Sequence, residues 1–348
     1  MPDGWRVLVT GISGVLAARL ARSLSEHDGV DEVIGVDARL PVHDLGRTRI
    51  VRSELTSPVI PEVLDRERID TLVHLAINSA RDDTGPQGRA RIRELNVIGS
   101  MQLLAAAQRS PHLRTVILKS TTAVYGSEPG NRALFSEEVT TTESKAGYAK
   151  DMIEVEGYAR AFSRRREGVV LTVLRFANLL GSGIDSAFAR YLALPVIPTV
   201  LGYDPRIQFC HTDDAVEVLR QACLDTRPGI YNVAGPGVLY LSQVARIAGR
   251  PTAPVPLPLV EGLAGVFRRV RHMDVQADQL QYLSYGRVAD ITRLRERFGY
   301  EPRYTTRETL RAFLDEQGIR PLVGESSWLR LEERARELTR RIAAGDDR

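Results

Sequence analysis

Cysteine and long apolar runs are scarce in this chain of 348 residues. The two cysteines, Cys210 and Cys223, form no CxxC pair and no metal-like spacing, which argues against a disulfide framework and favours reduced thiols in a cytoplasmic protein. The longest apolar stretch, at 193–203, is broken by Pro195 and Pro198 and is shorter than the roughly 20 apolar residues of a spanning helix. The chain begins with neither a basic segment nor an apolar signal core, so we expect a protein without a leader or a membrane span.

Lysine is also rare, because only Lys119, Lys145 and Lys150 occur among 47 basic residues. The net charge of +3 is small for this length, and the contents of 43% hydrophobic and 26% charged residues are those of an ordinary globular protein. Short basic runs at 163–166 and 267–272 have acidic neighbours and are typical of solvated faces. We therefore expect a small-molecule partner rather than nucleic acid or a membrane surface.

Short apolar runs alternate with longer amphipathic segments through the first half of the chain. Five runs are typical of strands buried on both faces, at 5–11, 31–37, 71–76, 114–120 and 169–178. Three segments have apolar residues three or four apart, as in helices, at 13–27, 90–108 and 148–165. This alternation predicts an α/β fold with a doubly wound parallel sheet and helices on both faces.

Glycine spacing at the first strand–helix junction is typical of a dinucleotide-binding loop. Gly11 permits a tight turn, Gly14 lets backbone N–H groups approach a pyrophosphate, and Ala17 is small enough for helix–strand packing. Asp37 follows at the end of the second strand, where a carboxylate accepts both ribose hydroxyls and repels a 2′-phosphate. These features favour NAD over NADP, although Arg39 two residues later points the other way.

These and further motifs together resemble the extended (atypical) short-chain dehydrogenase/reductase family, the NAD-dependent epimerases and dehydratases, and in particular UDP-glucose 4-epimerase-like proteins. The matching pieces span about residues 5 to 315 and are TGISGVLA (10–17), Asp37, SELTSP (53–58), HLAI (74–77), NVIGS (96–100), STTAVYG (120–126), Tyr148, LRFAN (174–178), FCHTDD (209–214) and YNVAG (231–235). The resemblance implies a Rossmann sheet, NAD, a smaller C-terminal substrate-binding domain, and a homodimer formed by the helices near 91–108 and 148–164.

The expected domain division follows this resemblance and the change in composition after Asn178. We predict an NAD-binding Rossmann domain over 1–178, completed by about 205–235, and a smaller substrate domain from 179–204 and 236–322. Residues 323–348 have one apolar helical stripe and predict an amphipathic helix with a tail. The segment HTDDAVEVLRQACLD, at 211–225, predicts a helix capped by Thr212 or Asp213.

Family roles carry over position by position. The positions that match cofactor contacts are Gly11, Ser13, Gly14 and Val15 for the pyrophosphate, Asp37 for the adenosine ribose, Glu54 and Leu55 for adenine, and Ala76, Met152 and Phe176 for the nicotinamide half. Glu54 stands where the family usually has aspartate. Thr121 matches the residue that hydrogen-bonds the reacting hydroxyl, Tyr148 matches the acid/base, and Asn178 matches a substrate contact.

The residue one turn after Tyr148 departs from the family pattern. The family has a lysine there, on the same side of the helix, which donates to the nicotinamide ribose and lowers the tyrosine pKa. Met152 does neither, because a thioether carries no charge and no donor. Lys150 lies about 200° around the helix from Tyr148, and Lys145 precedes the helix. Tyr148 is therefore either the acid/base of a slowed reaction or an aromatic residue packed beneath the cofactor.

A second departure concerns the substrate. Sugar-nucleotide members of the family have an arginine four residues before the position of His211, where it clamps the diphosphate. That position is Ile207, and the adjacent Arg206 would point to the opposite face of a strand. This departure argues against a UDP-sugar unless an arginine elsewhere compensates.

Other polar residues have simpler explanations. His211, Asp213 and Asp214 resemble a metal cluster by type, but a helix cap and packing account for them, and we expect no metal. His74 lies in a buried-strand pattern and is expected to be packed rather than catalytic.

Two functions fit these observations. The first is an NAD-dependent oxidoreductase of the epimerase/dehydratase type that acts on a carbinol of a sugar-like or other small polar substrate. The second is a catalytically weak NAD(H)-binding protein that senses redox state or scaffolds a partner. Thr121, Tyr148 and Asn178 favour the enzyme, whereas Met152 and Ile207 favour the second.

Overall fold

The computed structural model describes residues 4–77, 85–139, 147–256 and 277–322. The helix expected at 323–348 and Lys145 lie outside these ranges. None of the helices within them is long and apolar enough to cross a membrane. Both cysteines are free and buried.

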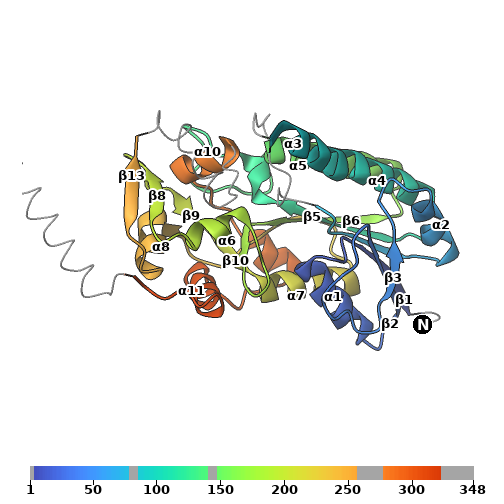
Figure 1. The fold of residues 1–348 in the computed structure, drawn as a ribbon. Coiled ribbons are helices and arrows are strands. Elements are labelled where there is room, and N and C mark those ends of the chain that lie inside the picture. The colour runs from blue at the N-terminus through green and yellow to red at the C-terminus, as the bar shows by residue number, and fades with distance from the viewer. Residues whose placement is uncertain (1–3, 78–84, 140–146, 257–276, 323–348) are drawn as a thin grey trace, which may run out of the picture.

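A single seven-stranded parallel sheet organises the larger part of the molecule, as the alternating pattern predicts (Figure 1). In spatial order its strands are β11 (Gly229–Val233), β6 (Val170–Phe176), β5 (Thr115–Thr121), β4 (Thr71–His74), β1 (Trp5–Thr10), β2 (Val30–Asp37) and β3 (Arg49–Arg52). The strand order reverses beside β1, since the chain runs through β2 and β3 on one side and returns to β4 on the other. Ligands of such sheets bind at this reversal, outside the carboxyl ends of the strands.

Helices cover both faces of the sheet. They are α1 (Val15–Ser25), α2 (Val59–Arg66), α3 (Gly85–Arg93), the π-helical turn η1 (Glu94–Ile98), α4 (Gly99–Arg109), the 3-10 turn η2 (Thr122–Tyr125), α5 (Gly147–Arg165) and α7 (Thr212–Leu224). In Figure 1, α1 and α7 lie along one face, and α4 and α5 lie along the other. Each face has its own apolar cluster, which the two-sided hydrophobicity of the strands requires.

The start of α7 corrects one expectation. His211, rather than Thr212 or Asp213, is the N-cap, and its Nδ1 accepts a hydrogen bond from the Asp213 N–H at 3.1 Å. Thr212 is already inside the helix, and its hydroxyl donates to the Leu180 carbonyl at 3.0 Å. An imidazole nitrogen therefore supplies the acceptor that a hydroxyl or carboxylate usually provides at this position.

The C-terminal half adds a smaller lobe with its own apolar cluster, seen at the left of Figure 1. Three pairs of short strands build it: β7 (Asn178–Leu180) with β10 (Phe209–His211), β8 (Ile197–Val200) with β13 (Thr252–Val255), and β9 (Arg206–Ile207) with β12 (Leu239–Tyr240). Its helical segments are α6 (Ala187–Leu192), α8 (Leu241–Ile247), α10 (Ala277–Tyr285) and α11 (Thr306–Glu316). The π-helical turn η3 (Leu294–Phe298) instead packs against β11, in the apolar cluster of the sheet's α1 face. Because β7 and β10 continue directly from β6 and into α7, this lobe stands beside the carboxyl ends of the sheet.

A series of buried polar residues links α5 to strands β5, β6 and β11. Glu156 of α5 accepts from Arg175 Nε at 2.9 Å and Nη2 at 2.7 Å, and from the Ser120 hydroxyl at 2.6 Å. Arg175 Nη1 donates to the Tyr125 hydroxyl at 2.9 Å, which donates to Asn232 Oδ1 at 2.7 Å. Burial acts to lower the pKa of Arg175, but the hydrogen bonds and charge of Glu156 outweigh it and raise that pKa.

Candidate functional site

The phosphate loop between β1 and α1 has backbone geometry that only glycine satisfies easily. Gly11 has φ +77°, and a Cβ there would lie 2.8 Å from the Ala76 backbone N and Cα. Gly14 is the N-cap of α1, and its N–H donates to the Gly11 carbonyl at 3.0 Å. The loop therefore lies directly against the backbone that follows β4, at the positive end of a helix.

Asp37 closes the other side of this loop. Its Oδ2 accepts from the Ser13 N–H at 3.1 Å and from the Ser13 hydroxyl at 2.6 Å. Its Oδ1 accepts from the Arg39 N–H at 2.9 Å. The Arg39 side chain is exposed, and among the described contacts only the backbone N–H of Arg39 bonds Asp37. The carboxylate predicted to read the ribose thus lies beside the predicted pyrophosphate loop.

Four further predicted cofactor positions come from the segment after β3, the start of α1 and the end of β6. Glu54 is exposed after β3, and Leu55 is half-buried next to the start of α4, where a Cβ on Gly99 would lie 3.5 Å from it. Val15 is half-buried at the first turn of α1, and Phe176, at the end of β6, is 2% exposed within the apolar cluster on the α1 face.

Thr121 and Tyr148 come from different elements at the same edge of the sheet. Thr121 is the last residue of β5 and is half-buried, and its Oγ1 accepts from the Ala123 N–H at 3.2 Å, which caps η2. Tyr148 is the second residue of α5, half-buried against the apolar cluster of that face. Because α5 packs against η2, the fold brings the backbones of these two segments together at the carboxyl end of β5.

The helix after Tyr148 presents no cation at the family's lysine position. Met152 has no exposed surface and belongs to the apolar cluster under α5. Lys150 is exposed, as its position on the opposite side of the helix predicts. The side chain of Met152 reaches no open surface, so its contact with a cofactor stays a prediction.

His74 is packed, as its strand pattern predicts. It has no exposed surface, its Nδ1 lies 2.8 Å from Thr10 Oγ1, and its Nε2 lies 2.8 Å from Ser100 Oγ. The Ser100 hydroxyl also donates to the Asn96 carbonyl in the π-helical turn η1. Burial, together with the positive charge of Lys119, lowers the pKa of His74 to about 3. This histidine is neutral and structural.

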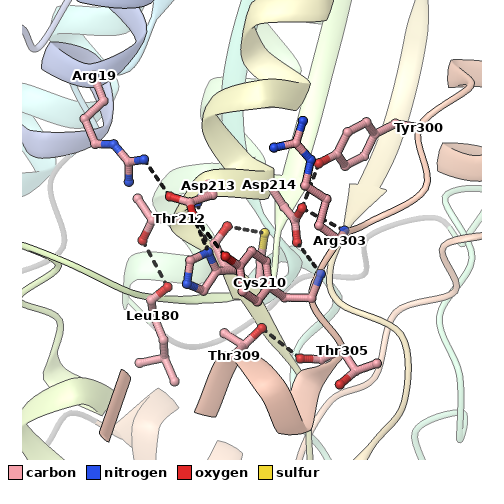
Figure 2. A network of polar contacts seen from close by, with 12 residues as sticks. Arg19, Leu180, Cys210, Thr212, Asp213, Asp214, Tyr300, Arg303, Thr305 and Thr309 are labelled. Carbon is pink, nitrogen blue, oxygen red and sulfur yellow. Dashed lines mark hydrogen bonds and ion pairs between the residues drawn. The ribbon is translucent and has the colours of Figure 1, made fainter. Parts of the chain in front are cut away.

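The acidic residues at the start of α7 point to separate partners (Figure 2). Asp213 pairs with Arg19 at 2.5 Å, whereas Asp214 accepts from the Tyr300 hydroxyl at 2.7 Å and from the Arg303 N–H at 2.9 Å. His211 lies over the Tyr304 ring, with the two ring centroids 3.8 Å apart. In the part of the chain that the structure describes, no three His, Cys, Asp or Glu side chains form a group able to hold a metal ion.

The positions predicted to face the substrate, Asn178 and Ile207, lie in the smaller lobe. Asn178 is half-buried and donates from Nδ2 to the Tyr282 hydroxyl of α10 at 2.6 Å, and burial raises the pKa of Tyr282 to about 12. Ile207 has no exposed surface within the lobe's apolar cluster, while Arg206 beside it is half-buried. The position of the family's diphosphate arginine therefore lies in apolar core.

Sequence reasoning overlooked Lys119, a half-buried residue of β5 two positions before Thr121. Its signal was present in the sequence, because a lysine inside an otherwise apolar strand is unusual in a chain with three lysines.

Comparison with known proteins agrees with this architecture. The model of the NAD dependent epimerase/dehydratase family matches residues 7–234. An uncharacterized protein of Mycobacterium tuberculosis is 39% identical over 322 residues, which cover 91% of this chain and 85% of that protein.

Two solved structures have the same fold. A Bacillus cereus UDP-glucuronic acid 4-epimerase, in complex with UDP-glucuronic acid and NAD, is 19% identical with a TM-score of 0.69, and covers 89% of this chain and 98% of its own. A Thermotoga maritima UDP-glucose 4-epimerase, with UDP-glucose, is 20% identical with a TM-score of 0.68, and covers 90% and 98%. The glycine cradle against Ala76 and the carboxylate of Asp37 fit a dinucleotide. This chain therefore belongs to the NAD dependent epimerase/dehydratase family, and its cofactor is NAD.

Proposed function

We propose that the protein is an NAD-dependent oxidoreductase that acts on a carbinol of a sugar-like or other small polar substrate. One observation carries this proposal: the Gly11 cradle and Asp37 lie at the same sheet edge as Thr121 and Tyr148. A protein that only binds NAD needs the Gly11 cradle and Asp37. Thr121 and Tyr148 are needed only where a substrate hydroxyl reacts. The smaller lobe, including Asn178, holds the substrate over this edge.

The cofactor side of this proposal uses the positions that match the family's cofactor contacts. Gly11, Ser13, Gly14 and Val15 receive the pyrophosphate at the start of α1, and Asp37 receives the adenosine ribose. Glu54 and Leu55 flank the adenine, and Ala76, Met152 and Phe176 border the nicotinamide half. A carboxylate at position 37 repels a 2′-phosphate, so NAD is preferred over NADP.

The chemistry divides between cofactor and side chains. Bound NAD would supply the hydride acceptor for the substrate carbinol, and the hydride donor where an epimerisation or dehydration needs the hydride back. The Thr121 hydroxyl hydrogen-bonds the reacting hydroxyl and fixes its orientation. Tyr148, in its phenolate form, accepts the hydroxyl proton and later returns it. Because Met152 supplies no charge, the phenol of Tyr148 is not acidified from that position, and proton transfer is slowed.

We expect the substrate to be bound without the arginine that usually clamps a diphosphate in this family. Ile207 occupies the clamp position and is fully buried, so no cation can be presented there without disrupting the lobe. The similarity to UDP-sugar epimerases supports a sugar-like carbinol. The diphosphate of a nucleotide sugar, in contrast, has no partner at this position.

A homodimer is proposed from an exposed apolar row on η1 and α4. Leu95, Ile98 and Met101 are three residues apart, and they are 40%, 37% and 37% exposed. Their spacing puts them along one side of the helical segment that the family resemblance implicates in pairing.

The test is hydride transfer by the purified chain. Turnover of a panel of free sugars, sugar phosphates and nucleotide sugars should be followed in two ways: by absorbance at 340 nm, which reports net NADH formation, and by chromatography of the products, which reports an epimerisation or dehydration that returns the hydride. Thr121→Val and Tyr148→Phe should abolish turnover while leaving NAD binding intact. If no member of the panel is turned over while NAD binds tightly, the enzyme proposal fails.

That failure would favour the second candidate, a catalytically weak NAD(H)-binding sensor. One structural observation supports this candidate: the position of the family's catalytic lysine is apolar core in this chain.

A further inference from the structure

Lys119 lies on the face of the sheet that carries α1 and the phosphate loop. Side chains alternate along a strand, so Lys119 shares a face with Ile117 and Thr121. Ile117 belongs to the apolar cluster beneath α1 and α7. Ser120, on the opposite face, hydrogen-bonds Glu156 of α5. This alternation puts Lys119 on the same face of the sheet as Thr121, two residues before it on β5.

The strand register puts Lys119 beside the floor of the glycine cradle. On one side Lys119 pairs with Leu174 of β6. On the other side Leu118 pairs with His74, so Leu75 comes opposite Lys119. A Cβ on Gly11 would lie 3.0 Å from the Leu75 carbonyl carbon and 2.8 Å from the Ala76 backbone. Lys119 therefore borders the backbone platform on which the phosphate loop rests.

No described residue provides a counter-charge for this cation. Within the described ranges, no hydrogen bond or ion pair engages its ammonium, and no carboxylate raises its pKa, which burial lowers to about 8. The carboxylates of α7, which packs on β5, are already committed, Asp213 to Arg19 and Asp214 to Tyr300. A half-buried ammonium without a partner is costly, so its retention points to a partner that arrives from outside the chain.

We propose that Lys119 is the cation of the cofactor site, and that its ammonium pairs with the anionic dinucleotide in place of the lysine absent at position 152. The inference rests on the proposed function, since it concerns the same site. The bound dinucleotide supplies the negative charge that no described residue provides for this ammonium. Because this cation comes from β5 and not from α5, residue 152 on α5 can be apolar.

Binding and stability should then respond in opposite directions to the loss of this charge. A charge-assisted hydrogen bond accounts for roughly a tenfold to hundredfold difference in affinity. Lys119→Met retains most of the side-chain volume and removes the charge. The ligand-free variant should unfold at the same or a higher urea concentration than the wild type, because an unpaired cation has been replaced by an apolar group.

The experiment uses the full chain, with NADH as the probe, titrated by calorimetry. Lys119→Met should weaken NADH binding at least tenfold, and Lys119→Gln, which retains a donor without charge, should fall between it and the wild type. Lys150→Met is the matched control, because Lys150 is exposed on α5, and its Kd should stay within twofold. Urea unfolding of each ligand-free variant is recorded in parallel.

The outcomes separate this inference from the proposed function. Equal NADH affinity of wild type and Lys119→Met overturns the role of Lys119 alone. A Lys119→Met chain that fails to fold, or unfolds at distinctly lower urea, also overturns it, because the lysine would then be structural. If the wild type itself binds no NADH, the proposed function fails and takes the inference with it.

Discussion

Glu156→Ala should lower the free energy of unfolding by about 3–5 kcal/mol, the range for breaking a buried ion pair by removing one partner. Glu156 has no exposed surface, and its carboxylate accepts from Arg175 at 2.9 and 2.7 Å and from Ser120 at 2.6 Å. Without it, Arg175 keeps only its hydrogen bond to Tyr125 among the described contacts, and its charge stays buried. The bond from Arg160, whose side chain is 39% exposed, contributes little.

Two variants test whether the loss comes from the unpaired charge. Glu154→Ala removes a carboxylate from the same helix, but its partner Arg93 is 49% exposed, so the cost should be about 0–1 kcal/mol. The double variant Glu156→Leu/Arg175→Met replaces both charges with apolar groups of similar size. It should recover most of the stability lost by Glu156→Ala, because no charge remains buried.

Urea unfolding followed by far-ultraviolet circular dichroism measures these differences on the ligand-free chain. A Glu156→Ala midpoint as high as that of Glu154→Ala would refute the reasoning. It would mean that water or shifted backbone carbonyls solvate the Arg175 guanidinium once Glu156 is gone.

Three further outcomes are expected. Gly11→Ala should weaken NAD binding more than tenfold by calorimetry, because the position has φ +77° and the new Cβ would meet the Ala76 backbone at 2.8 Å, and unchanged affinity would contradict the assigned cradle. Asp37→Ala should reduce the preference for NAD over NADP, as competition titrations with both cofactors would reveal, and an undiminished preference would move the selectivity elsewhere. For His74 the folded pKa is about 3 and the unfolded value about 6.5, so stability should fall as pH drops through this window, by up to about 1.4 kcal/mol per pH unit. His74→Gln should flatten this dependence in unfolding titrations, and equal acid sensitivity of the variant would exclude His74 as its source.

Features that depend on neighbouring residues could be predicted from the sequence. Gly11, Gly14 and Asp37 were predictable because a tight turn, a helix start and a strand end impose local requirements on residue type. The exposure of Lys150 follows in the same way from helical geometry, whereas the full burial of Met152, which we predicted as a cofactor contact, does not.

Features that depend on strand register could not be predicted. Glu156 and Arg175 are 19 residues apart and meet only because α5 packs across β6. Lys119 stands out in the sequence as a lysine inside an apolar strand, but its place beside the glycine cradle depends on the register of β5 with β4 and β6. The cap at His211 was missed because imidazole, hydroxyl and carboxylate can all accept the same hydrogen bond, and only the backbone dihedrals select one of them.

The bonds between Asp37 and Ser13 have a consequence for how this protein could evolve. In the proposed function, this one side chain both discriminates between the two cofactors and holds Ser13 in the loop that receives them. A change at position 37 toward the phosphorylated cofactor would therefore also release Ser13 and loosen the loop. Such a change becomes tolerable only after another residue has taken over the loop's support, so cofactor preference is expected to be one of the most slowly changing properties of this lineage.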